Sequence, residues 1–452
     1  MLRSTFWVLA GAVLFSQGNH LPATPPIESA SSPSGVRPQP GSDWGAAARA
    51  ELIEKIADQL DRNYVDGKAG REIGELLKQK LKGGAYDRLD RPAQFAEAVT
   101  QDLQRTNGDL HLTLRYSPDP AGARGGGQPG FDPFAGARQQ NFGINRAEIL
   151  EGNVGYLAFS GFLQGSGWEE TLVDALRFLS RTDAMIIDLR MNGGGSGHMG
   201  DFLLSHFLEA RAIPTVRIKS RHAPEPLVIH SLAAVPGPRR PDVPLYLLAS
   251  QGTGSAAEAF AFVLKNLRRA TVIGTRTAGA GNTVGFFPAG QGFTLGYSIT
   301  HVSDPRTGST WEQVGVQPDV AVSPEWALQE AHVAALQRLI DTIPDPNRVR
   351  VLKRLVEAAQ ARRRPLPVDR ENLARYEGNY GGRVVRVREG RVTYARNAGA
   401  LPEELVHLGG GRFALGAARI CFEDRDGMAT LILERSDGTE VSLPRSVPTF
   451  GF

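Results

Sequence analysis

The sequence predicts an α/β fold, preceded by a helical segment and followed by a small antiparallel β domain. Between residues 143 and 323, short apolar runs alternate with segments of helical periodicity. Such alternation is typical of a largely parallel sheet covered by helices. Apolar residues recur at helical spacing before this region, and short alternating strands with Gly turns follow it. The expected strands are residues 154–159, 184–189, 215–218, 245–248 and 271–273, and the expected helices are residues 168–179, 201–208 and 256–267.

The composition is that of a globular protein and excludes several classes of partner. The 452 residues are 41% hydrophobic and 22% charged, with 51 basic and 48 acidic side chains giving a formal net charge of +3. This balance provides no field that would attract nucleic acid or an anionic membrane surface. The single cysteine, Cys421, excludes an intramolecular disulfide and a cysteine-based metal site. We therefore expect no nucleic-acid partner and no metal.

The N-terminus is typical of a secretory signal peptide. Arg3 precedes an apolar run at residues 6–15, which is too short to span a bilayer as a stable helix. We expect residues 1–20 to direct export, and the mature protein to be periplasmic or extracellular without a membrane span. No clean cleavage site follows, so a retained anchor remains an alternative. Residues 21–43 are rich in Pro, Ser and Gly and predict a disordered linker.

Changes in composition predict the boundaries of the folded segments. Residues 44–116 are expected to form a helical bundle that ends in a strand, and residues 117–140 a Gly/Pro-rich loop. Residues 141–330 would form the α/β domain, residues 331–370 a helical connector and residues 371–452 the small β domain.

The run Ser250-Gln251-Gly252-Thr253-Gly254-Ser255-Ala256-Ala257-Glu258 lies between an expected strand and an expected helix. It places Ser255 at a helix N-terminus, where free amides and the helix dipole stabilise developing negative charge. Ser255 is therefore a candidate nucleophile for acyl transfer. An alternative is purely structural, because Ser255 and Glu258 also fit a capping box.

A second Gly-rich segment, residues 188–197, follows the expected strand at 184–189. The consecutive glycines, including Gly194 and Gly195, leave backbone amides open to a substrate oxygen, as an oxyanion hole requires. Residues 195–200 also satisfy the G-x-G-x-x-G dinucleotide fingerprint. Because no acidic residue ends the next strand, we expect no dinucleotide and no other cofactor.

Two ionisable residues could complete a catalytic site. His111, in Asp109-Leu110-His111, lies between the helical segment and the α/β region, and histidine is the commonest general base near neutral pH. Glu312, in a turn-rich stretch after Trp311, could orient a histidine and stabilise its charged form. Taken singly, His111 could be a structural histidine and Glu312 a solvated loop residue.

Together these segments resemble the tail-specific (C-terminal processing) serine peptidase superfamily, in the branch with the tricorn core and the repeats of interphotoreceptor retinoid-binding protein. The N-terminal region resembles the three-helix module of those repeats, and the likeness covers roughly residues 44–325. The motifs that carry it are residues 188–195 (Asp-x-Arg-x-Asn-Gly-Gly-Gly), 253–258 (Thr-x-Ser-Ala-x-Glu), 265–274, 277–279 and 311–319, with Gly84-Ala85-Tyr86-Asp87 and Asp109-x-His111 in the N-terminal part.

The resemblance implies a crotonase-like ββα catalytic domain and an exported serine peptidase acting on peptide or protein substrates. It further implies Ser255 as nucleophile, His111 as general base and Glu312 as its support. The oxyanion hole would use the amide of Ala256 and that of Gly194 or Gly195. The alternative function is a non-catalytic binder of hydrophobic ligands such as retinoids or fatty acids, as the retinoid-binding repeats suggest.

Departures from the family pattern narrow the subtype. Ala280 stands where the Ser/Lys members carry lysine, so a Ser/Lys dyad is excluded. The segment between the helical bundle and the sheet is too short for a PDZ domain, which argues against PDZ-based recognition of substrate tails. Leu110 replaces the serine that precedes the histidine in the tricorn core, so Glu312 would reach His111 directly or through water.

Overall fold

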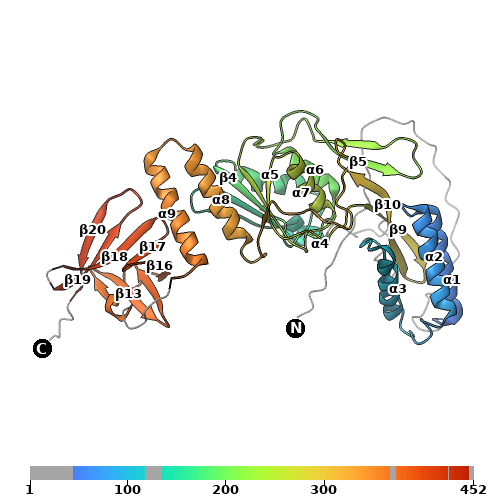
Figure 1. Ribbon diagram of the computed structural model, residues 1–452, viewed down its shortest axis with the longest axis horizontal. Coiled ribbons are helices and arrows are strands. Elements are labelled where there is room, and N and C mark those ends of the chain that lie inside the picture. Colours follow the sequence, from blue (N-terminus) through green and yellow to red (C-terminus); the bar gives the residue numbers. More distant parts are fainter. Residues whose placement is uncertain (1–43, 118–134, 367–372, 426, 447–452) are drawn as a thin grey trace.

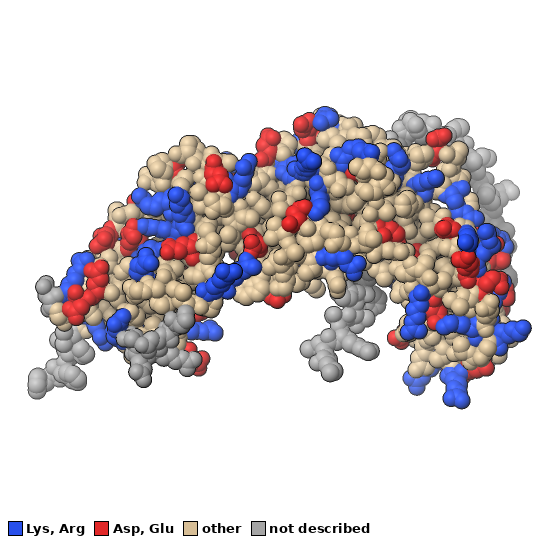
Figure 2. Space-filling model, in the orientation of Figure 1, with Lys and Arg blue, Asp and Glu red and all other residues tan. Residues whose placement is uncertain are grey.

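A computed structural model describes residues 44–117, 135–366, 373–425 and 427–446 (Figure 1). The expected signal peptide and linker, and most of the Gly/Pro-rich loop, lie outside the described residues. Three helices lie at one end of an elongated molecule, an α/β layer structure occupies the middle, and antiparallel strands lie at the other end. Acidic and basic side chains are interspersed over the face shown in Figure 2. None of the described helices is both long enough and apolar enough to cross a membrane.

The N-terminal helices are α1 (Ala46–Asn63), α2 (Gly67–Lys82) and α3 (Pro92–Asn107). Their buried faces follow the helical spacing of the sequence, as with Leu52, Ile56 and Leu60 on α1. These helices share their core with strand residues far along the chain, including Phe293 and Leu295. The helical segment is thus built onto a sheet and does not form a core of its own.

That sheet has the strand order β1-β10-β5-β6, with β9 also paired to β10, and every pairing is antiparallel. Thr113 on β1 lies opposite Gly296 on β10. The pairing brings the segment around residue 111 against the α/β part of the chain. The strands are β1 (Thr113–Tyr116), β5 (Pro214–Ser220), β6 (Leu227–His230), β9 (Thr283–Gly290) and β10 (Phe293–Ser303).

The central sheet has the order β11-β8-β7-β4-β3-β2 and is parallel except for the β2–β3 pair. Alternate residues of β7 enter opposite cores: Leu247 packs toward α5, α6 and α7, and Leu248 packs toward α8. The apolar run at 245–248 therefore reflects burial on both faces. The elements are β2 (Ile144–Leu150), β3 (Val154–Phe159), β4 (Ala184–Asp188), β7 (Leu245–Ala249), β8 (Thr271–Gly274), β11 (Val320–Ala321), α4 (Ala135–Gln139), α5 (Trp168–Phe178), α6 (Gly197–Ser205), α7 (Ala256–Asn266) and α8 (Ala327–Thr342), with a 3-10 turn at Asn141–Gly143.

The C-terminal part begins with α9 (Pro346–Arg363), which packs on α8 and on β16. Two antiparallel sheets follow, and their shared core contains Tyr376, Tyr380 and Phe413. The strands are β12 (Gly378–Tyr380), β13 (Arg383–Arg388), β14 (Arg391–Ala395) and β15 (Glu403–Glu404) in one sheet, and β16 (Val406–Gly409), β17 (Arg412–Leu415), β18 (Ala418–Arg425), β19 (Met428–Glu434) and β20 (Glu440–Pro444) in the other, after a 3-10 turn at Ala374–Tyr376.

The mixed α/β fold is confirmed, with two local corrections. Helix α6 runs over Gly197–Ser205, whereas the sequence predicted residues 201–208. It begins earlier because the Ser196 side chain caps it, accepting the Met199 amide at 3.1 Å. The predicted strand at 215–218 forms, but as β5 it belongs to the antiparallel sheet, not to the parallel one.

Candidate active site

Ser255 occupies the N-cap of α7, immediately after the loop that leaves β7. Its backbone has φ 49° and ψ −118°, a left-handed conformation that is rare for a residue with a side chain. Such strain is found preferentially at functional sites, because the surrounding structure must hold it in place. Ser255 also lines a cavity of about 390 Å³.

Glu258 holds this turn from inside the protein. It is fully buried, and its carboxylate accepts the amides of Ser255 (2.9 Å), Gly279 (2.7 Å) and Ala280 (2.8 Å) and the hydroxyl of Thr277 (2.5 Å). Burial raises the pKa of the Glu258 carboxyl, and the four hydrogen bonds act in the opposite direction. Glu258 therefore does more than cap α7, since it joins the Ser255 turn to the segment that carries Ala280.

The loops after β4 and β7 lie side by side, at the carboxyl ends of adjacent parallel strands. The Gly254 amide donates to the Asn192 carbonyl at 3.0 Å. A Cβ at Gly194 would lie 2.8 Å from the Ser255 Cβ and 3.1 Å from the Ala256 nitrogen. Gly194, with φ 106°, is therefore required for this close approach.

Of the two glycines expected to supply an amide to an oxyanion hole, only Gly195 is left as a candidate. The Gly194 amide donates to the Asn192 side-chain oxygen at 2.9 Å, so it is not available to a substrate oxygen. The sequence alone does not predict this hydrogen bond. The Phe162 amide donates to the Gly194 carbonyl, and the Ser196 amide donates to the Phe162 carbonyl. In this parallel bridge the amide of Gly195, which lies between them, points away from Phe162. Gly195 and Ala256 both line the cavity, and Ala256, as the first residue of α7, has no helical acceptor for its amide.

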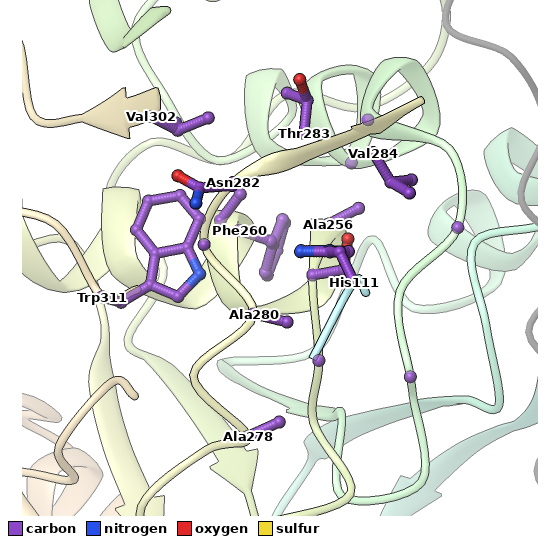
Figure 3. A pocket seen from close by; sticks show the side chains of 18 of the residues that line it. His111, Ala256, Phe260, Ala278, Ala280, Asn282, Thr283, Val284, Val302 and Trp311 are labelled. Carbon is purple, nitrogen blue, oxygen red and sulfur yellow. The ribbon is translucent and has the colours of Figure 1, made fainter. Parts of the chain in front are cut away.

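His111 lines the same cavity as Ser255. It lies just before β1 of the antiparallel sheet, whereas Ser255 follows β7 of the central sheet. Figure 3 shows its ring in the cavity, with Ala256 and Ala280 in view around it. The side chain is 10% exposed, and its two ring nitrogens have no hydrogen-bond partner among the described residues. A buried imidazole with open nitrogens is suited to exchange a proton with a substrate or nucleophile.

The carboxylate nearest to His111 belongs to Asp109. Its Oδ1 lies 3.5 Å from the His111 Nδ1 and accepts the His111 amide at 2.8 Å. The Tyr64 hydroxyl donates to Oδ2 at 2.8 Å and in turn accepts the Asn107 amide at 2.7 Å. Burial acts to raise the pKa of Asp109, but the hydrogen bonding and charge of His111 hold that pKa below its ordinary value. Asp109 is thus a fixed anion beside the ring. Its carboxylate accepts the backbone amide of His111 in an Asx turn, and the Asp-x-His spacing is the sequence signal that could have indicated this contact.

Glu312 lies in the same neighbourhood but bonds to the backbone. Its Oε2 accepts the amides of Gly281 (2.6 Å) and Asn282 (2.8 Å), and its buried Oε1 has no partner among the described residues. Burial raises the pKa of Glu312, as does the negative charge of Asp109, while the charge of His111 lowers it. The expected contact between Glu312 and His111 is not among the hydrogen bonds of the described residues, and Glu312 instead holds the 281–282 backbone.

The remaining walls of the cavity are largely apolar. Figure 3 shows Phe260, Val302 and Trp311 around it, together with Val284. Ala280 lines the cavity at the position where a Ser/Lys enzyme would carry lysine, and no lysine of the described residues lines it. Within the described ranges, no group of three or more His, Cys, Asp or Glu side chains is arranged to hold a metal ion.

Residues 153–322 match the model of Peptidase family S41, and this range contains the loops of Ser255 and Gly195 together with Glu312. The central part of the chain is therefore similar to Peptidase family S41. The resemblance to the tail-specific protease superfamily is confirmed.

Individual relatives fit this assignment. The chain is 26% identical over 177 residues to a carboxy-terminal-processing protease of Bartonella bacilliformis, covering 38% of this chain and 39% of that one. It is 26% identical over 199 residues to a carboxy-terminal processing protease of Bacillus subtilis, covering 41% and 40%. The chain thus spans about two fifths of the length of these relatives.

Solved structures with a similar arrangement include a photosystem II D1 C-terminal processing protease. Its TM-score is 0.42 at 19% identity, covering 62% of this chain and 94% of that one. The tricorn protease has a TM-score of 0.40 at 16% identity, covering 66% and 37%.

Proposed function

We propose that this chain is an exported serine peptidase that hydrolyses peptide bonds through an acyl-enzyme on Ser255. The observation that carries the proposal is the strained Ser255 at the start of α7, in the same cavity as the ring of His111, whose Nδ1 lies 3.5 Å from Asp109. His111 is the general base, Asp109 positions it, and Glu312 adds a second negative charge nearby. The amides of Ala256 and Gly195 form the oxyanion hole.

In the first half of the reaction, the Ser255 Oγ attacks the peptide carbonyl while His111 takes the hydroxyl proton. The tetrahedral oxyanion is held by the two amides, which cost no reorganisation because the turn is already fixed by Glu258. The C–N bond then breaks, and His111 gives its proton to the leaving amine. In the second half, His111 activates a water molecule that attacks the acyl carbon and releases Ser255.

Labelling with a fluorophosphonate tests this proposal directly. The reagent is expected to modify Ser255 in the native protein, because it reacts with serines activated by a base and an oxyanion hole. Mass spectrometry should locate the label on Ser255, with none in Ser255→Ala and less in His111→Ala. The matched control is Ser309→Ala, an exposed serine away from the cavity, which should label like the wild type.

The apolar cavity also favours the alternative function, a binding protein for hydrophobic ligands. The two functions separate in the same experiment. Failure of the native protein to label, together with tight binding of a retinoid or fatty acid, would replace the peptidase proposal by the binding one.

Removing the charge of Asp109 or of Glu312 distinguishes their roles. We expect Asp109→Asn to lower kcat by about 10²- to 10⁴-fold with little change in KM, because Asp109 holds the ring of His111. Glu312→Gln should lower kcat by about 10-fold or less, since its bonds are to the 281–282 backbone. Steady-state kinetics on one peptide substrate measure both effects, and thermal unfolding checks that the variants are folded. A larger loss of kcat for Glu312→Gln would reverse the assignment.

A further inference from the structure

Asp201 is an ionisable residue of the cavity that the proposed reaction does not use. It lies in the middle of α6, and one face of that helix lines the cavity through Gly197, Gly200, Asp201 and Leu204. Gly200 packs close to the nucleophile helix, because a Cβ there would lie 3.7 Å from the Ala256 carbonyl oxygen. Asp201 is therefore next to the start of α7 and in the same cavity as Ser255.

The carboxylate of Asp201 has no partner inside the protein. Its backbone carbonyl accepts the Ser205 hydroxyl at 2.6 Å, but its side chain forms no hydrogen bond or ion pair among the described residues. Asp201 is partly exposed. Because it lines the cavity, a ligand in the cavity could reach it. This differs from Glu258 and Glu312, whose carboxylates are bonded to backbone amides.

The walls near Asp201 are apolar. They are contributed by Leu204 on α6, Val263 on α7, and Val216 and Ile229 on the β5–β6 pair. Burial in this setting raises the pKa of Asp201 to about 7. An unpaired carboxylate in apolar surroundings destabilises the empty site, and a cation entering the cavity would relieve that cost.

We propose that Asp201 selects a lysine or arginine side chain at the substrate residue whose carbonyl Ser255 attacks. The inference rests on the proposed peptidase function. The side chain of that residue enters the cavity beside Ser255 and Gly195, its methylene groups pack on the apolar walls, and its cationic end pairs with Asp201. Positive charge at this residue is thereby favoured over an apolar chain of equal length.

The preference should depend on pH through Asp201. Below pH 7 the carboxyl is largely neutral and does not attract a cation, so the preference should grow as the pH rises from 6 to 8. The other ionisable residues that line the cavity are His111, just before β1, and Arg115, on β1 itself. The lining residues of α7, β5, β6 and the 278–284 segment carry no charge. His111 serves both substrates in the same proposed role, so its contribution cancels in a ratio of two substrates.

The first measurement compares two peptide amides that differ only by lysine or norleucine before the cleaved bond. Norleucine has the lysine stem without the amine. At pH 8 the wild type is expected to have kcat/KM about 10- to 100-fold higher for lysine, and Asp201→Asn is expected to abolish this ratio. Glu209→Gln, which removes an exposed charge just after α6, should keep the ratio. A wild-type ratio near one, or an unchanged ratio in Asp201→Asn, overturns the proposal.

The second measurement does not require turnover. Calorimetry on Ser255→Ala protein compares binding of peptides that end in lysine or norleucine, with and without Asp201→Asn. Tighter lysine binding that is lost in Asp201→Asn supports the cation site even if fluorophosphonate fails to label Ser255, in which case only the peptidase function fails. Labelling of Ser255 without any lysine preference in either measurement leaves the peptidase and removes the role of Asp201.

Discussion

Replacing Ser255 by alanine is expected to lower kcat/KM for peptide hydrolysis by at least about 10⁴-fold, and His111→Ala should have a comparable effect. The two residues act as one unit, since His111 is useful only while it exchanges the Ser255 proton. The double variant should therefore be no less active than either single variant. Residual hydrolysis would come from the amides of Ala256 and Gly195, which neither change removes.

The kinetics are interpretable only if the variants fold. Far-ultraviolet circular dichroism and thermal unfolding of the three variants should match the wild type closely, because the ring nitrogens of His111 have no hydrogen-bond partner among the described residues and the Ser255 backbone is held by Glu258. Losses that multiply in the double variant would mean that the two residues act independently. That result would remove His111 as the base for Ser255.

Glu258→Gln is expected to have the second-largest effect, on stability and on reactivity together. All four partners of the carboxylate are donors, so the amide nitrogen of glutamine would face a donor and leave buried groups unpaired. We expect the free energy of unfolding to fall by about 2–4 kcal/mol. Fluorophosphonate labelling of the folded fraction should slow as well, because the Ser255 amide loses its anchor.

The control is Glu51→Gln, on an exposed i,i+4 ion pair with Lys55 in α1. Its free energy of unfolding should change by no more than about 0.5 kcal/mol. Denaturant unfolding measures both variants. An unchanged stability and an unchanged labelling rate in Glu258→Gln would show that the turn does not depend on this carboxylate.

The sequence was sufficient for features that depend on local patterns. The strands at 154–159 and 245–248 were predictable because strands buried on both faces are continuous apolar runs. The position of Ser255 before α7 follows from its Gly-rich turn and the helix after it. The start of α6 was predicted four residues too late because the apolar periodicity inside the helix did not include the cap at Ser196.

The parts of the site that the sequence could not supply depend on contacts between distant segments. The side chain of Asn192 takes up the Gly194 amide, and the bridge to Phe162 orients the Gly195 amide. These two contacts favour Gly195 over Gly194 as the proposed oxyanion donor. Among the described residues Asp109 is the carboxylate that approaches His111, at 3.5 Å, whereas Glu312 bonds to loop amides through Oε2. In the sequence Asp201 has the appearance of an ordinary helix-surface residue, since its apolar neighbours on β5 and β6 lie many residues away.

The pairing of β1 with β10 brings together proposed catalytic residues that come from two parts of the molecule. Ser255 is held by the central sheet, whereas His111 is fixed through Asp109 to Tyr64 and Asn107, at the ends of α1 and α3. The two parts are joined by a shared apolar core, by the β1–β10 ladder and by bonds such as that from the Val65 amide to the Ser298 carbonyl at 2.8 Å. The proposed base and nucleophile thus share one cavity through the pairing of β1 with β10. The proposed peptidase activity would consequently report on that pairing as well as on the chemistry itself.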